Sequence, residues 1–350
     1  MQNDNGKRDF ATSVLKTTGY GSADAAAEGE DRPDRMPRVP WAAVGVFIAV
    51  SFGLAWLVAL PLWLIDDDRP GYTAMFSVVA AAMMYTPAIA TLVTMFAMRE
   101  PRGQRLRFLG MWPLRPAKRV VWFTVAALFA PLALVVACTL VAAAFGWLKL
   151  DLVGFSGFAQ LIDQQLTGLG SKSMAETARA ALPPLGVLVL AQIAVIPFGG
   201  LFNALLAFGE EVGWRGWLLP ALRPLGVWPG LLMSGAIWGL WHSPLILLGY
   251  NFELTDWRGV AVMTVGCALW GVLFGWVRLR SASLWPAVIG HGALNASAGL
   301  FMVLAAADSP MDLWLVSPLG VSGWVVVAVL AATLALAGQL RKEPQLAPKR

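Results

Sequence analysis

Charged residues are scarce in this sequence. Asp, Glu, Lys and Arg make up only 13% of its 350 residues, whereas 58% of the residues are hydrophobic. In soluble globular domains, charged residues account for roughly a quarter of the chain. The composition therefore excludes an ordinary soluble domain, and with a mean hydropathy of +0.65 it indicates an integral membrane protein.

Cysteine is rare as well. Cys138 and Cys267 are the two copies, and both lie within apolar runs, so we expect small buried thiols rather than a disulfide framework. The net charge of +5 comes from short basic segments between apolar stretches, not from a basic face on a soluble domain. Such segments orient membrane proteins, and we expect a lipid bilayer as a partner and no nucleic acid.

Long apolar runs dominate the rest of the chain. They follow a polar segment at residues 1–38, which lacks the apolar core of a signal peptide and is expected to be a disordered tail. Eight such stretches lie near residues 41–65, 72–98, 120–146, 185–208, 228–249, 259–277, 284–306 and 313–339. Each reaches or approaches the roughly 20 residues with which a helix crosses a bilayer, where only helices or closed barrels satisfy their backbone. The sequence predicts an all-α membrane protein, a bundle of about eight transmembrane helices.

The charges between these stretches predict the orientation. Basic residues are concentrated in residues 99–119 and recur at Arg278 and Arg280, whereas the alternate connections carry acids such as Asp66. Cytoplasmic connections carry the excess of Lys and Arg. We therefore expect a multi-pass protein of the plasma membrane, with both termini cytoplasmic and an external loop within residues 147–184.

Histidine occurs twice, and both copies lie inside predicted spans. A lone intramembrane histidine is usually a neutral residue that hydrogen-bonds two helices. Here, however, His242 and His291 accompany an intramembrane Asn295 and two adjacent carboxylates, Glu210 and Glu211. Ionisable residues at membrane depth are costly and mark functional sites. This group is the candidate site.

Spacing assigns the two carboxylates to different faces. Glu211 and Arg215 are four residues apart with the acid first, so they share a helix face as a favoured ion pair. Glu210 points elsewhere and is expected to face a cavity. Trp214 and Trp217 follow, and we expect them to hold this segment in the membrane interface. The structural alternative is the solvated start of a cytoplasmic helix.

The two histidines repeat this spacing. Trp238 precedes His242 by four residues, and Pro244, which cannot donate a backbone hydrogen bond, is expected to kink the helix beside the histidine. His291 and Asn295 are likewise four residues apart, among small residues that let helices approach closely. On a purely structural interpretation, Trp238 packs in the core and His291 and Asn295 hydrogen-bond between helices.

A carboxylate, two imidazoles and an amide that meet in a cavity suit peptide hydrolysis. Glu210, aided by a histidine, can remove a proton from water, and neutral His and Asn donors can hold the oxyanion on the scissile carbonyl. No cofactor is then required. Alternatively, Glu210, His242 and His291 could bind Zn²⁺ with water in the fourth position, although the usual H-E-x-x-H helix is absent.

Three motifs on successive helices resemble those of the CAAX protease and bacteriocin-processing (CPBP, Abi-type) family of intramembrane proteases, which includes Ras-converting CAAX endopeptidases. They are Glu210-Glu211-x-x-x-Arg215, Trp238-x-x-x-His242 and His291-x-x-x-Asn295. The resemblance implies an intramembrane endopeptidase that acts on a peptide or membrane-protein substrate. It also implies that Glu210 and His242 activate water and that His291 and Asn295 bind the oxyanion. Glu211, Arg215 and Trp238 would support the site, although the family more often has Phe at the position of Trp238.

The resemblance covers residues 185–306, which we expect to be the protease core. The remaining parts are then the cytoplasmic tail 1–38, the N-terminal transmembrane helices and external loop 39–184, and the last transmembrane helix with its cytoplasmic tail 307–350. A catalytically silent membrane binding or immunity protein is one alternative, and a small-solute transporter is another. The Gly-x-Ser-Gly at residues 154–157 imitates rhomboid serine proteases, but it lies in the polar external stretch.

Overall fold

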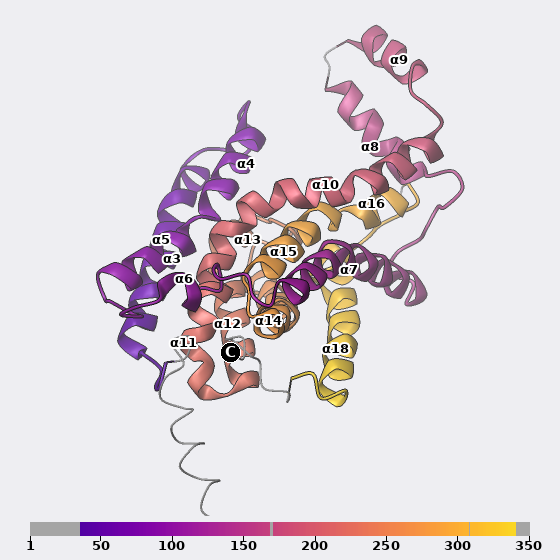
Figure 1. The fold of residues 1–350 in the computed structure, drawn as a ribbon. Helices are drawn as coiled ribbons and strands as arrows, with labels where there is room; N and C mark the ends of the chain where they lie inside the picture. Colours follow the sequence, from indigo (N-terminus) through magenta and orange to yellow (C-terminus); the bar gives the residue numbers. More distant parts are fainter. Residues whose placement is uncertain (1–35, 169–170, 308, 341–350) are drawn as a thin grey trace, which may run out of the picture.

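The computed structural model describes residues 36–168, 171–307 and 309–340, and most of these residues are helical (Figure 1). In chain order the helices are α3 Trp41–Leu64, α4 Tyr72–Met83, α5 Thr86–Phe96, α6 Arg105–Phe108, α7 Ala117–Ala144, α8 Ser156–Thr167, α9 Lys172–Ala180, α10 Leu185–Glu211, the π-helix η1 Val212–Leu218, α11 Leu219–Leu222, the 3₁₀ turn η2 Arg223–Leu225, α12 Val227–Trp241, α13 Ser243–Ile246, α14 Trp257–Ser281, α15 Trp285–Ser297, α16 Leu300–Leu304, α17 Leu313–Val316 and α18 Val321–Leu336. Extended pairing within these ranges is limited to an isolated bridge between Leu150 and Ala305. The predicted all-α class is confirmed, whereas the tail expected at residues 1–38 lies almost wholly outside the described residues.

Seven helical segments of the described chain are long and apolar enough to cross a bilayer. They are Trp41–Leu64, Tyr72–Phe96, Ala117–Ala144, Leu185–Leu225, Trp257–Ser281, Trp285–Leu304 and Leu313–Leu336. The eighth predicted stretch, 228–249, forms α12, whose 15 residues rise only roughly 22 Å before the helix ends at Trp241. The expected bundle of about eight spans is therefore seven candidate spans and one shorter helix.

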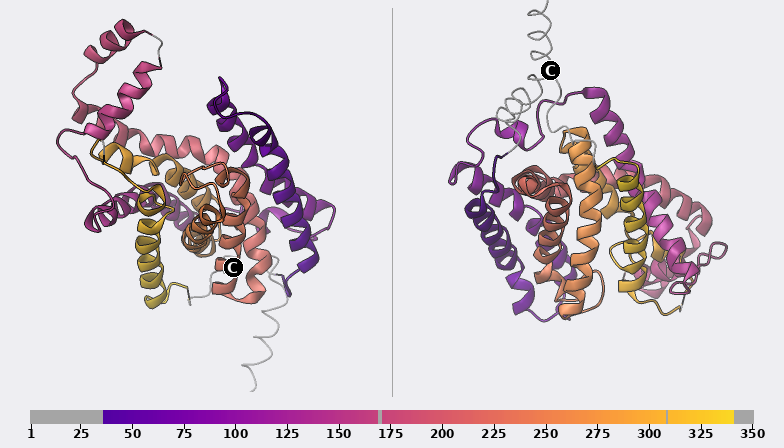
Figure 2. Two further views of the ribbon diagram at one scale, coloured as in Figure 1. Left: turned by 180° about the vertical axis from the view of Figure 1, so that it is seen from behind. Right: turned by 90° about the horizontal axis from the view of Figure 1, so that it is seen from below.

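The bundle places the two ends of the helical region together. The first turn of α3 and the last turn of α18 lie at the same end of the molecule (Figures 1 and 2). The compartment at that end stays a prediction.

The basic connections that were predicted to share one side of the membrane meet in the structure. Nη2 of Arg278, near the end of α14, donates to the backbone oxygen of Phe108 at 2.9 Å. The backbone N–H of Leu284 donates to the oxygen of Gly110 at 2.8 Å. The 99–119 segment therefore packs against the connection between α14 and α15.

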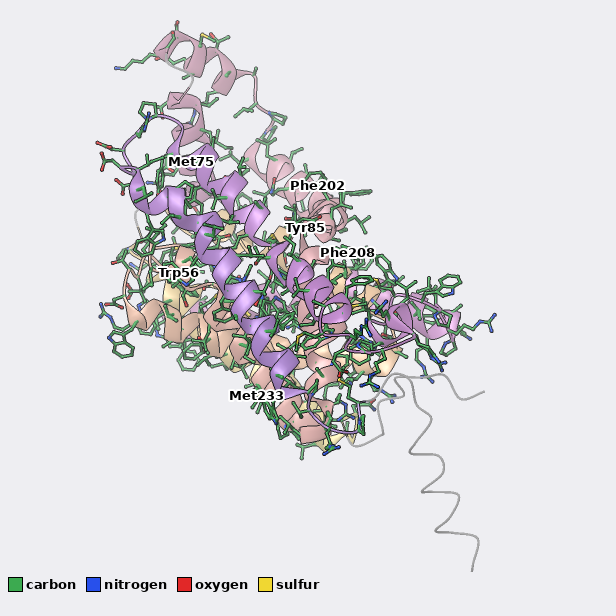
Figure 3. All side chains as sticks on the ribbon, turned by 90° about the vertical axis from the view of Figure 1, so that its left-hand side faces the viewer. Trp56, Met75, Tyr85, Phe202, Phe208 and Met233 are labelled. Carbon is green, nitrogen blue, oxygen red and sulfur yellow. The ribbon has the colours of Figure 1, made fainter. Side chains whose placement is uncertain are left out.

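The outer surface is strongly apolar. Along α10, Leu190, Phe198 and Phe202 expose 70%, 71% and 70% of their surface. Figure 3 shows Phe202 on this outer face near Tyr85, whose hydroxyl donates to the backbone oxygen of Leu205 in α10 at 2.7 Å. Contiguous apolar exposure of this kind marks a surface that another apolar phase covers. A lipid bilayer provides that phase.

Close helix contacts hold the three motif-bearing helices in place. α15 packs against α10 and α7, and α12 packs along α14. A Cβ on Gly292 of α15 would lie 2.4 Å from the backbone oxygen of Gly200 in α10, and one on Gly239 of α12 would lie 2.4 Å from Cα of Thr264 in α14. Small residues at such positions let helix backbones touch. The motifs are thereby brought to one region of the bundle.

Candidate active site

The first motif lies where α10 changes into a π-helix. α10 ends at Glu211, and the chain continues through η1. Turns of π-helix are rare and occur frequently at functional sites. Gly213 allows η1 to pack on α5, because a Cβ at this position would lie 2.4 Å from Cβ of Pro87. Glu210 and Glu211 are both buried, with 2% and 0% of their surface exposed.

Oε1 of Glu211 receives two partners. Nη1 of Arg215 donates to it at 2.7 Å, which is the pair that the spacing predicts, and Nδ1 of His291 lies 2.9 Å from the same oxygen. The guanidinium of Arg215 also lies 4.3 Å from the ring centre of Trp238, within cation–π range. The contact with His291 joins the first motif to the third across 80 positions of sequence, and it was not predicted.

Glu210 is oriented away from this pair, as the helix geometry predicts. Its Oε2 accepts the indole N–H of Trp238 at 2.6 Å and that of Trp214 at 3.3 Å. Trp214 and Trp217 are fully buried and pack against the ring of Phe47 in α3. Neighbouring helices thus cover both tryptophans, and their predicted depth at the membrane interface stays a prediction.

His242 lies at the break between α12 and α13. Nδ1 of His242 is 2.9 Å from the backbone oxygen of Trp238. A carbonyl oxygen only accepts, so Nδ1 carries the proton and Nε2 keeps a lone pair. The helix ends at Trp241 and resumes at Ser243, which is the interruption predicted from Pro244. The histidine is thus held as a ring with one free acceptor nitrogen.

A cavity of about 370 Å³ brings the predicted residues together. Glu210, His242, His291 and Asn295 all line it. Further lining comes from Met83, Met84, Asn203, Tyr250, Asn251 and Met263. Glu211 and Arg215 do not belong to this lining, so they lie behind the residues that a substrate would meet. The lining combines apolar side chains with a few polar groups, as binding sites usually do.

Some contributors to the site were not predicted. Trp214 stands four residues after Glu210, and this spacing was an available signal for their contact. Tyr250 and Asn251 lie in the connection between α13 and α14 and have no such signal. Their place in the lining depends on how that connection folds back over the cavity.

The Gly-x-Ser-Gly stretch at residues 154–157 forms a turn that leads into α8. The carboxylate of Asp151 accepts the backbone N–H groups of Gly154 at 2.7 Å and of Ser156 at 3.1 Å. The Ser156 hydroxyl, followed by these N–H groups, lowers the pKa of Asp151 to about 2. Oγ of Ser156 also accepts the backbone N–H of Ala307 at 3.0 Å. The serine therefore has a structural role in this turn.

The zinc alternative requires three ligands within reach of one ion. Among residues 36–168, 171–307 and 309–340, no three His, Cys, Asp or Glu side chains form such a group. Nδ1 of His242 lies against a backbone oxygen and Nδ1 of His291 against the Glu211 carboxylate, and Oε2 of Glu210 accepts two indole N–H groups. That the reaction requires no cofactor stays a prediction.

Comparison with known proteins agrees with this geometry. Residues 190–297, which contain all three motifs, match the family model for the type II CAAX prenyl endopeptidase, Rce1-like. This segment of the chain is therefore similar to the Rce1-like CAAX endopeptidases. A curated relative, CAAX prenyl protease 2 of Methanococcus maripaludis, is 28% identical, over 33% of this chain and 53% of the relative. The chain spans about half the length of that relative, so the likeness to it concerns part of each protein.

Proposed function

We propose that this protein is an intramembrane endopeptidase that hydrolyses a peptide bond with a water activated by Glu210. The proposal depends on one observation, the shared cavity lined by Glu210, His242, His291 and Asn295. A catalytically silent binding protein would not need a carboxylate, two imidazoles and an amide on the same small cavity. Each of these groups has a part in amide hydrolysis.

Glu210 acts as the general base in this proposal. Its Oε2 is occupied by indole donors, so Oε1 takes a proton from water while the water oxygen attacks the scissile carbonyl. The free Nε2 of His242 accepts the second hydrogen of that water and orients it. The proton on Glu210 then passes to the leaving amine when the C–N bond breaks.

His291 and Asn295 bind the oxyanion in this proposal. Because Nδ1 of His291 faces the Glu211 carboxylate, it carries a proton, and Nε2 can donate to the oxyanion only if the ring is an imidazolium. This departs from the neutral donor expected from the sequence. An imidazolium at this position faces the negative charge that develops on the substrate.

The substrate in this proposal is a peptide segment presented at or within the membrane. The family acts on peptides, and the cavity combines polar groups with methionines that suit an apolar neighbour. The name of the curated relative favours a C-terminal CAAX peptide that carries a prenyl group. A bacteriocin leader or a segment of another membrane protein offers the same chemistry, and we propose action at the plasma membrane.

Glu210→Gln tests the proposal. Glutamine keeps the shape of the side chain and loses its basicity, so the variant should fold and lose about 10²- to 10⁴-fold in turnover. Mass spectrometry of membrane peptides should find uncut precursors in cells with the variant and not in cells with the wild type. Glu253→Gln, at an exposed position, is the matched control and should cleave normally. Wild-type turnover by a folded Glu210→Gln protein would refute the assignment of the base.

A further inference from the structure

Trp238 is the side chain through which the three motifs meet. Its indole N–H donates to Glu210, and its ring lies 4.3 Å from the guanidinium carbon of Arg215. Its ring centre is 5.2 Å from that of His291, in an edge-on arrangement, and 5.8 Å from that of His242. Only 2% of its surface is exposed. The residue is thus enclosed by the groups that the proposed reaction uses.

The hydrogen bonds to Glu210 are one-sided. Trp238 and Trp214 both donate to Oε2, at 2.6 Å and 3.3 Å, and within the described residues no hydrogen bond reaches Oε1. The shorter bond comes from α12, a different helix from the one that carries Glu210. It therefore determines how the carboxylate stands relative to His242, which follows at the end of the same α12. Trp214 lies on the continuation of α10 and moves with Glu210.

We propose that Trp238 is a positioning residue for the general base: by holding Oε2 it fixes the plane of the Glu210 carboxylate and leaves Oε1 to take the proton from water. This inference rests on the proposed hydrolase function. The inference goes beyond that function, because a phenylalanine, which has no N–H, would pack equally well at position 238. The indole nitrogen is what the proposal assigns to the reaction.

Trp238→Phe separates these roles, since it keeps an aromatic ring and removes the donor. We expect KM to stay within about twofold and kcat to fall about tenfold to a hundredfold, the range for losing a hydrogen bond to a charged group. The acid limb of kcat/KM against pH should move to higher pH, because a carboxylate without its donor holds a proton more tightly. The substitution leaves the other titratable residues around Glu210 unchanged. These are Glu211, Arg215, His242, Tyr250 and His291.

Trp270→Phe is the matched control. It also removes a buried indole N–H, which donates to the backbone oxygen of Pro318 at 2.9 Å, away from the carboxylates. This control should lower thermal stability at most, with kcat and the acid limb unchanged. If Trp238→Phe behaved like Trp270→Phe in both kinetic readouts, the proposal would be overturned. Should Trp238→Phe not fold, benzothienylalanine at position 238 keeps the shape of the indole without its N–H and takes its place.

A second readout does not depend on turnover. In protein labelled with ¹⁵N-tryptophan, the indole resonance that is missing from Trp238→Phe belongs to Trp238. It should move upfield in Glu210→Gln, because a neutral amide oxygen accepts a weaker hydrogen bond than a carboxylate, while the Trp270 resonance stays in place. An unmoved Trp238 resonance would overturn the proposal. If the Trp238 resonance moved in Glu210→Gln but the wild-type protein cleaved no peptide, the proposed function would be overturned instead.

Discussion

Nδ1 of His291 lies 2.9 Å from Oε1 of Glu211, and the same oxygen accepts Nη1 of Arg215 at 2.7 Å. One carboxylate oxygen thus serves a cation on its own helical segment and a histidine that lines the cavity. All three side chains are at least nine-tenths buried. In such a group each charge depends on its partner, because an uncompensated charge in a buried site is expensive. Glu211 therefore couples the stability of the bundle to the orientation of His291.

Glu211→Gln should destabilise the protein. The change leaves Arg215 buried without a negative partner, and breaking a buried pair from one side costs about 3–5 kcal/mol in soluble proteins. A lower melting temperature in detergent and a lower yield should follow, with activity lost in proportion. The double variant Glu211→Gln/Arg215→Gln should be less unstable than the sum of the two single variants. Additive effects would mean that the pair contributes no coupling energy.

Gly292→Ala should loosen the contact between α10 and α15. Its Cβ would lie 2.4 Å from the backbone oxygen of Gly200 and 2.5 Å from the nitrogen of Ala204, and backbone atoms cannot turn aside as a side chain can. Overpacking of this kind costs about 1–3 kcal/mol. Gly299→Ala is the control, since nothing lies within 4 Å of its Cβ position. Equal melting temperatures for the two variants would contradict the packing described here.

Hydrolysis should survive removal of metal ions. The proposed base is a carboxylate with a free oxygen, and the described residues offer no group of three metal-binding side chains. Purified protein should therefore cleave its peptide at an unchanged rate after exhaustive chelation. Stoichiometric zinc in the purified protein, with activity lost on its removal and restored on its return, would identify a metalloprotease instead.

Cysteine labelling should reveal opposite sides of the membrane for two exposed positions. Arg102→Cys lies in the basic 99–119 segment and Asp67→Cys in an acidic connection, and both native residues are exposed. The native Cys138 and Cys267 are buried, so they give little background. An impermeant maleimide added to intact cells should label only Asp67→Cys. Labelling of Arg102→Cys alone would reverse the predicted orientation.

Local patterns in the sequence determined the helices and several features of the site. Apolar runs of about 20 residues predict spans because an isolated helix must satisfy its own backbone in lipid. The spacing of four residues predicts the contact between Glu211 and Arg215, and Pro244 predicts the break beside His242. These features depend on residues within about one turn of each other, where helix geometry alone decides which side chains meet. The predicted count of eight spans did not take this break into account, because the length of an apolar run does not show where a helix ends.

Only the tertiary structure decided which helix faces meet. The contact of Glu211 with His291 spans 80 positions, and that of Trp238 with Glu210 spans 28. A periodic pattern shows that a helix has a polar face, but it does not name the helix that packs against it. That choice depends on close backbone approaches, such as Gly292 against Gly200, which arise only when the whole bundle packs. The burial of η1 by the surrounding helices has the same origin, which is why its tryptophans are enclosed by side chains of other helices.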